Sequence, residues 1–185
     1  MRTIFLLLTI TLIAESCGNS AGETVTIPAK PASPDAVKQY VKGKTYKSIK
    51  AGTASTFEID KENPYQWLDE KKDTTKFVRN YLAERLQFTL QFVNDTAVEF
   101  TDDNKKTTGV YKFDTETGED EKEGVKLRIS YVDTSMQFPG ASGAATMTYT
   151  YPVAGADEKS LLLETPRSFN NRKVVILMSQ SAVSN

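Results

Sequence analysis

Histidine is absent from this chain of 185 residues, and cysteine occurs only once. Without histidine, the chain can form neither a Ser-His-Asp nor a Cys-His nucleophile system, and it has no imidazole ligand for a metal. A single cysteine allows neither an internal disulfide nor a zinc site built from several thiolates. The sequence therefore predicts a protein that is not an enzyme and that holds no metal or other cofactor.

An excess of charge of one sign is also missing. The chain has 23 Lys and Arg against 24 Asp and Glu, which gives a formal net charge of −1. This balance gives no reason to expect that the molecule as a whole binds nucleic acid or an anionic surface. Its length and its 39% content of hydrophobic residues fit one globular domain.

The longest apolar run lies at the N terminus. It extends from Ile4 to Ala14 after the basic residue Arg2 and is interrupted only by threonine. The run is about half of the ~20 apolar residues that a transmembrane helix needs. We therefore expect residues 1–16 to be a secretory signal peptide that is cleaved after Ser16.

The single cysteine stands where this signal ends. The passage resembles a bacterial lipoprotein signal, in which Cys17 would become the first residue of the mature protein and carry fatty acyl chains such as palmitate. Ser16 fits that pattern, whereas Ala14 and Glu15 replace its usual leucine and small neutral residue. Ordinary secretion with cleavage at the same bond stays the alternative. Lipidation is favoured because a free thiol is a liability in an oxidising compartment.

Residues 17–33 are rich in Gly, Ser, Ala and Pro, which is typical of a flexible tether. Residues 34–181 then form the folded domain. Gly18 and Asn19 follow the cysteine, so no acidic pair marks export to the outer face of the cell. We expect a protein that is lipid-anchored in the outer membrane, with its body in the periplasm.

Apolar and polar residues alternate through most of the body, as at Leu86, Phe88, Leu90 and Phe92. Such alternation indicates strands with one buried face. Short connections favour antiparallel neighbours that close into an up-and-down barrel, and the runs are shorter than the ~9–11 residues of a membrane strand. Eight strands are predicted, at 44–51, 86–93, 96–101, 108–114, 125–131, 146–153, 160–165 and 173–179.

One segment has the helical period of 3.6 residues. Asn63 and Pro64 can begin a helix that carries Trp67 and Leu68, and Asp73 can cap a second helix. We therefore predict a helical insertion between the first and second strands of the barrel. Asn94-Asp95 is expected to form a two-residue hairpin turn between the second and third of these strands.

A short helix is also expected between Ser33 and Gly43, just before the first strand. With that helix, the residues 41–46, Val-Lys-Gly-Lys-Thr-Tyr, resemble the start of a lipocalin-like barrel of the calycin type. Tyr46 follows the glycine by three positions, where lipocalins usually have Trp two positions after it. The late arginine that packs across this aromatic in lipocalins corresponds to Arg172 or Arg167. The resemblance covers residues 36–180 and implies a mainly β barrel.

The paired helices of the insertion are similar to the lid of fatty-acid-binding relatives. A lid of this kind implies a small apolar ligand, with aromatic side chains around the mouth of the barrel. The alternative is that the aromatics fill a solid core, as eight-stranded barrels allow. The candidate ligand-binding residues are Trp67, Phe77, Tyr81, Phe138 and Tyr149.

Carboxylates are frequent, but their pattern fits no known site. In residues 114–123, Gly118 is fifth from Asp114, whereas a calcium loop of the EF-hand type needs glycine at its sixth position. Glu99 lies between Val98 and Phe100 and should face outward. No carboxyl group has the apolar setting that would raise its pKa for glycosidase-like acid catalysis.

Residues 161–163 and 174–178 are apolar on both faces, unlike the earlier strands. We expect the helices of the body to cover the outer face, and another protein is the alternative cover. The function predicted is binding or carriage of a small apolar ligand by a lipid-anchored envelope protein. The alternative is an accessory subunit of an outer-membrane protein complex, with a solid barrel as scaffold.

Overall fold

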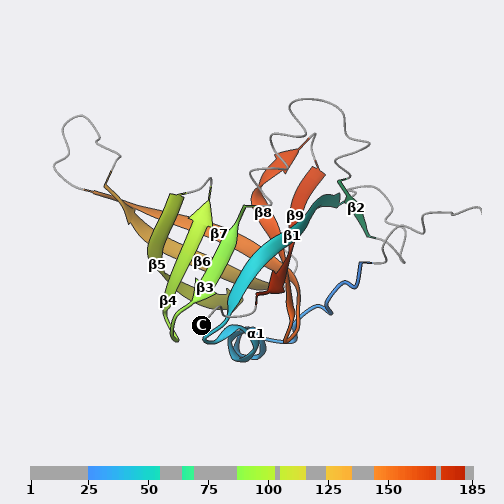
Figure 1. Cartoon of the computed structure of the whole chain (residues 1–185), viewed down its shortest axis with the longest axis horizontal. Helices are drawn as coiled ribbons and strands as arrows, with labels where there is room; N and C mark the ends of the chain where they lie inside the picture. Colours follow the sequence, from blue (N-terminus) through green and yellow to red (C-terminus); the bar gives the residue numbers. More distant parts are fainter. Residues whose placement is uncertain are drawn as a thin grey trace, which may run out of the picture.

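The computed structural model describes residues 25–54, 64–68, 87–102, 105–115, 124–134, 144–169 and 172–181 (Figure 1). These residues form one helix, α1 (Pro34–Val41), and strands whose order follows the chain. The strands are β1 (Thr45–Ala54), β2 (Tyr65–Trp67), β3 (Thr89–Phe92), β4 (Ala97–Asp102), β5 (Lys105–Thr115), β6 (Val125–Asp133), β7 (Ala145–Ala156), β8 (Ser160–Phe169) and β9 (Arg172–Gln180).

The strands form a closed antiparallel barrel. Each strand from β3 to β9 pairs with the next, and β1 pairs with both β3 and β9, which joins the two ends of the sheet. The extra strand β2 pairs with β1 beyond the point where β3 leaves it. The predicted mainly β, eight-stranded antiparallel barrel with a short N-terminal helix is confirmed, and it is compatible with a lipocalin-like architecture.

Helix α1 closes one end of the barrel. Ser33 caps the helix, because its Oγ accepts a hydrogen bond of 3.2 Å from the backbone N–H of Ala36. Val37 and Val41 lie on one face of the helix and are buried in the barrel core. Gly43 then adopts φ 68°, a conformation that suits glycine, and turns the chain into β1.

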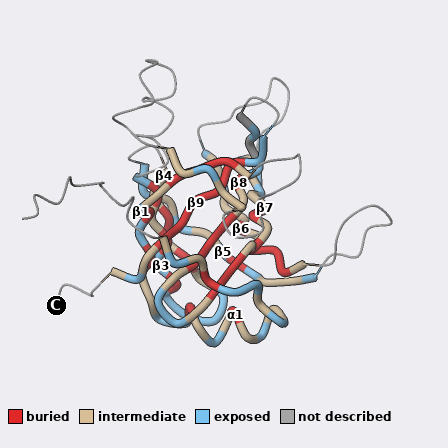
Figure 2. Tube along the Cα trace, turned by 90° about the vertical axis from the view of Figure 1, so that its right-hand side faces the viewer, coloured by how far each residue is buried: buried red, intermediate tan, exposed pale blue. Residues whose placement is uncertain are grey.

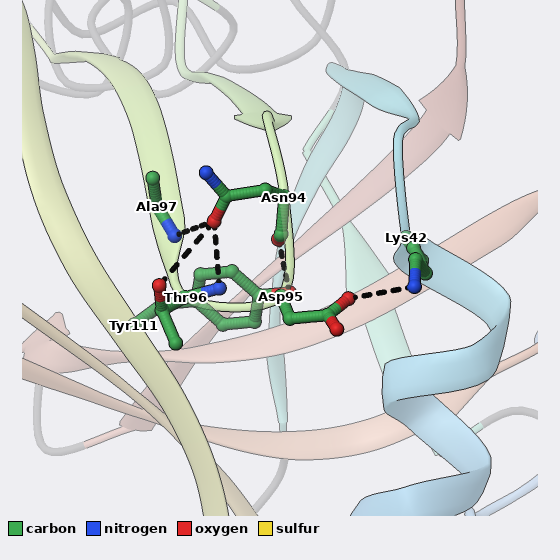
Figure 3. Close-up of polar contacts among 6 residues, drawn as sticks. All are labelled: Lys42, Asn94, Asp95, Thr96, Ala97 and Tyr111. Carbon is green, nitrogen blue, oxygen red and sulfur yellow. Dashed lines mark hydrogen bonds and ion pairs between the residues drawn. The ribbon is translucent and has the colours of Figure 1, made fainter.

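The turn between β3 and β4 is fastened to this end (Figure 3). The side chain of Asn94 accepts hydrogen bonds from the backbone N–H groups of Thr96 (2.9 Å) and Ala97 (2.7 Å). Lys42, just after α1, forms an ion pair of 2.9 Å with Asp95, and its hydrogen bond and charge lower the pKa of that carboxyl group. Val93 N donates to Ala97 O, so the turn is longer than the two residues predicted.

Aromatic rings fill the barrel next to α1. Tyr46 is fully buried and meets Phe92 edge to face at 6.1 Å between ring centroids. Phe92 meets Tyr111 in the same way at 4.9 Å and stacks with Phe113 at 6.1 Å. Burial, and then the charge of Asp157, raises the pKa of Tyr46 to about 12. Figure 2 shows this buried interior surrounded by more exposed backbone.

A second apolar cluster lies outside the barrel, on β8 and β9. It explains why these two strands are apolar on both faces. In the part of the chain that the structure describes, the cover comes from an N-terminal segment and from β2, rather than from helices. Buried Leu162, Val175 and Leu177 pack there against Val25, Ile27, Tyr65, Trp67 and Ala154.

The N-terminal segment of this cluster, residues 25–29, is held by backbone contacts. The carbonyl of Ala29 accepts a hydrogen bond of 2.9 Å from the N–H of Ala156 in β7. The carbonyl oxygen of Pro28 lies so close to Gly155 that a Cβ there would overlap it. Residues 25–29, expected as part of the tether, therefore lie against the barrel, and residues 17–24 are outside the described residues.

The prediction of a helix that begins at Asn63-Pro64 and carries Trp67 is wrong, because Trp67 lies on a strand. Tyr65 and Trp67 lie on β2, which pairs with β1 through Ala54↔Tyr65 and Gly52↔Trp67. In a strand, residues two apart share a face, so both rings reach the outer apolar cluster. In a helix they would point in nearly opposite directions. The second predicted helix, from Asp73, lies outside the described residues.

Strand pairing closes the barrel near α1. Toward the opposite end, which we call the open end, β7 and β8 separate. Within the described residues, β7 and β8 pair only from Val153↔Leu163 to Ala156↔Leu161. Nearer the open end, β7 continues with β6 and β8 with β9. Proline cannot donate to a ladder, and Pro152 and Pro166 lie in the parts of β7 and β8 that separate. In Figure 1, β3 to β7 lie on one side and β8, β9, β1 and β2 on the other.

The contact at Gly155 gives a first prediction. Gly155→Ala should displace residues 25–29 from β7, because the added Cβ overlaps the Pro28 carbonyl oxygen. We expect a loss of about 1–3 kcal/mol in the free energy of unfolding, measured in urea, and faster proteolysis near residue 28. Thr146→Ala, at an exposed position of the same strand, is the control and should change neither. Equal stability of the two variants would contradict the docking of this segment.

Candidate functional site

The open end of the barrel carries three interacting rings, Phe100, Tyr131 and Tyr149, which we call the ring cluster. Phe100 and Tyr131 meet edge to face at 5.3 Å, and the rings of Tyr131 and Tyr149 are 5.6 Å apart. Phe100 is only 4% exposed, whereas both tyrosines are half-buried. The aromatic packing of the core therefore comes to the surface here.

Gly109 on β5 allows this arrangement. β5 lies between β4, which carries Phe100, and β6, which carries Tyr131. A Cβ at Gly109 would lie 2.7 Å from Ser130 O and 3.3 Å from Tyr131 Cβ. The missing side chain leaves room for the Tyr131 ring to lean across β5 to Phe100. A glycine inside a strand signals such a close approach.

The two tyrosine hydroxyls of the ring cluster face one another. The Tyr131 hydroxyl donates a hydrogen bond of 3.3 Å to the hydroxyl of Tyr149. Burial, and then this bond and the negative charges of neighbours that include Asp133 and Asp102, raise the pKa of Tyr131 to about 12. The alternation of β4 and β6 places both aspartates on the inner face, one step beyond Phe100 and Tyr131. The site thus combines apolar rings, a hydrogen-bonded hydroxyl pair and nearby negative charge.

The sequence-predicted ligand residues do not form one group. Tyr149 belongs to the ring cluster, but Trp67 packs outside the barrel, 5.8 Å from Tyr65. Phe77, Tyr81, Phe138 and the predicted lipidation site Cys17 lie outside the described residues. Sequence reasoning missed Phe100, Tyr131 and Gly109 as site residues, although the alternation around them was clear.

Arg172 does not pack across Tyr46, the position that the lipocalin resemblance implies for a late arginine. Its Nη1 donates a hydrogen bond of 2.9 Å to Gln66 Oε1 on β2, at the open end. Tyr46, the aromatic that it would cover, pairs with Gln180 at the α1 end of the same β1–β9 ladder. The side chain of Arg167 lies outside the description.

The carboxylates on the outer wall form ion pairs. Glu99 faces outward as predicted and lies 2.6 Å from Lys106. Burial would raise the pKa of Asp114, but hydrogen bonds and charge from Lys112 and Arg128 outweigh it and lower that pKa. Within the described ranges, no group of three or more potential metal ligands occurs.

Comparisons with models of protein families, with curated proteins and with solved structures gave no match. Among the described residues, none of the helical structure is both long enough and apolar enough to span a bilayer.

The hydroxyl pair gives a second prediction. Tyr149→Phe removes the acceptor of the Tyr131 hydrogen bond, so the pKa of Tyr131 should fall from about 12 toward the ordinary value near 10. Burial is unchanged, so the fall should be partial. The measurement is an NMR titration of ¹³Cζ-labelled tyrosine, with Tyr46 as the internal control. A Tyr131 pKa that does not move would contradict the geometry of the pair.

Proposed function

We propose that the protein is a non-enzymatic, lipid-anchored protein of the cell envelope that binds a small apolar ligand at the open end of its barrel. The observation that carries the proposal is the half-buried ring cluster. Ligand sites are mostly apolar and aromatic, with a few polar groups that fix orientation. Tyr131 and Tyr149 supply both features.

The packing of the barrel limits the size and position of the ligand. Beneath the ring cluster, Tyr151 lies 5.7 Å from Phe88, and further rings extend the packing to α1. The ligand would therefore lie on the cluster at the rim, rather than deep in the barrel. A planar molecule without negative charge suits the rings and the nearby carboxylates of Asp102 and Asp133.

The chemistry of the described side chains supports a binding role. A hydroxyl with a pKa of about 12, as in Tyr131, is protonated at neutral pH and is a poor base or nucleophile. Asp114 has a lowered pKa and is held by two basic side chains, which suits an ion pair better than acid catalysis. These properties favour recognition over reaction.

The lipid anchor is proposed at Cys17, from the apolar leader that ends there. The docked segment begins at Val25, eight positions after Cys17. Eight extended residues span at most about 28 Å. An acylated Cys17 would hold the barrel within that distance of the outer membrane, with the body in the periplasm.

The third prediction concerns this anchor. Cys17→Ala should remove acylation and release the mature protein into the soluble periplasmic fraction, because the acyl chains on Cys17 are the membrane attachment that we propose. Fractionation and mass spectrometry of the N-terminal peptide measure the change. Ser20→Ala in the same segment is the control and should stay in the membrane. Unchanged retention of Cys17→Ala would remove the anchor from the account.

The fourth prediction tests the ring cluster with N-phenyl-1-naphthylamine, a neutral and planar fluorescent probe. We expect saturable binding by the Cys17→Ala protein, and about tenfold weaker binding when Tyr131 or Tyr149 is replaced by Ala. Val132→Ala is the matched control, since this residue is 59% exposed on the opposite face of β6. Equal effects of Tyr131→Ala and Val132→Ala on the probe would overturn the proposed site.

A second function is favoured by the filled half of the barrel. A solid barrel can serve as the scaffold of an accessory subunit in an outer-membrane protein complex. The outer wall also exposes Val110 (58%) on β5 and Val132 (59%) on β6, beside the hydroxyl pair Ser130 and Thr148. Failure to bind the apolar probe, with recovery of a stoichiometric partner in mild detergent, would favour this function over ligand binding.

A further inference from the structure

One edge of β7 is bare where β8 leaves it. Figure 1 shows the two strands diverging, and their described pairing stops at Val153↔Leu163. Within the described residues, β7 between Ala145 and Tyr151 pairs with β6 alone. Thr146 and Thr148 in this stretch are exposed. The described part of the chain therefore leaves this edge accessible to another strand.

The backbone groups on this edge belong to threonines. Tyr111 of β5 donates its N–H to the carbonyl of Thr96, so its neighbour Val110 bonds to the other side, where it faces Ser130 of β6. Ser130 is then bonded to β5, and its partner in β7, Thr148, directs its N–H and C=O away from β6. Their hydroxyls are 2.9 Å apart, which fits a non-hydrogen-bonded pair, where side chains come closer. The same orientation recurs at every second residue, namely Thr146, Thr148 and Thr150.

This part of β7 lacks the features that usually protect an exposed edge. Natural edges are shielded by charged side chains, proline or β-bulges. β7 is the longest of the described strands, with 12 residues, and none of them is charged. Its proline, Pro152, and its register shift after Val153 lie beside the end that pairs with β8. The stretch from Ala145 to Tyr151 is therefore an unprotected template for strand pairing.

We propose that this edge of β7 pairs with the same edge of a second copy, in an antiparallel dimer whose two-fold axis lies at Thr148. The three threonines that direct their backbone outward are centred on Thr148, so this register uses all of their N–H and C=O groups. Thr148 then faces its own copy, and Thr146 faces Thr150 of the second copy. Threonine pairs stabilise a sheet, and no like charges meet, because the strand carries none. A two-fold contact of this kind closes at two copies.

On the inner face, the same register places Met147 beside Tyr149 of the second copy. A thioether sulfur and an aromatic ring attract each other. Because Tyr149 belongs to the ring cluster, each copy then contributes a side chain to the ligand site of the other. That consequence rests on the proposed function, whereas the dimer itself does not. A ring cluster that fails to bind the apolar probe would leave the dimer in place.

The test is sedimentation of the Cys17→Ala chain over a range of concentrations, where we expect a reversible equilibrium between monomer and dimer. Thr148→Lys and Thr148→Asp should each weaken the dimer about tenfold or more, because like charges then meet across the axis. An equimolar mixture of these two variants should regain the parent affinity to within about threefold, since opposite charges meet. Thr108→Lys, at an exposed position of β5 outside the proposed interface, is the control and should stay within about twofold.

A second arm tests the register. The Cys17→Ala chain has no cysteine, so Thr148→Cys adds a single thiol on the proposed axis. Hydrogen-bonded residues in an antiparallel pair have Cα atoms about 5.5 Å apart, which a disulfide can bridge. Oxidation by diamide should therefore link two copies. Val132→Cys is the control and should stay unlinked, since Val132 lies on β6, one strand farther from the axis, and is 59% exposed.

Three results would overturn the proposal. The first is a parent chain that sediments as a monomer at every concentration. The second is an equal effect of Thr148→Lys and Thr108→Lys on the dimer, which would place the interface elsewhere. The third is equal cross-linking of Thr148→Cys and Val132→Cys. The cysteine variants keep the test decisive if a charged residue at position 148 prevents folding.

Discussion

The pairing of β1 with β9 is the constraint on which the rest of this structure depends. It joins the first and last strands of the barrel through a ladder from Tyr46↔Gln180 to Thr53↔Val174. β9 is also paired with β8, and the side chains of residues 174–178, which alternate between the two faces of the sheet, are all buried. The outer of these faces then requires a cover, which residues 25–29 and β2 supply. The β1–β9 ladder thus determines where the barrel core lies and where residues 25–29 and β2 pack.

Strand pairing closes the barrel next to α1. The pairing of β7 with β8 stops before these two strands end. Near α1, the rings of Tyr46, Phe92 and Tyr111 fill the barrel. Farther along, β7 parts from β8, and the buried aromatic packing gives way to the half-buried tyrosines of the ring cluster. The proposed ligand site has this origin, because the ring cluster lies on the inner face of the open end.

The sequence predicted the barrel strands well because alternation is a local signal, as at Phe88, Leu90 and Phe92. It failed at Trp67, where Pro64 suggested the first turn of a helix. Only pairing with β1, distant in the sequence, makes that segment a strand. Tyr149 was identified, but its neighbours were not. The approach of Phe100 to Tyr131 depends on Gly109 and on the register of three strands, and no single segment contains that information.

The most direct test of this account is hydrogen exchange of the backbone amides, followed residue by residue by NMR. The central claim is a barrel that is closed by β1 and β9 and parted between β7 and β8. It predicts slow exchange at every residue from Val175 to Met178, which have a paired strand on both sides. Along β7 of the monomer, between Thr146 and Tyr151, slow and fast amides should alternate, because β6 is the one described strand that accepts hydrogen bonds from this part of β7. Uniformly slow exchange along that part of β7 would contradict the account.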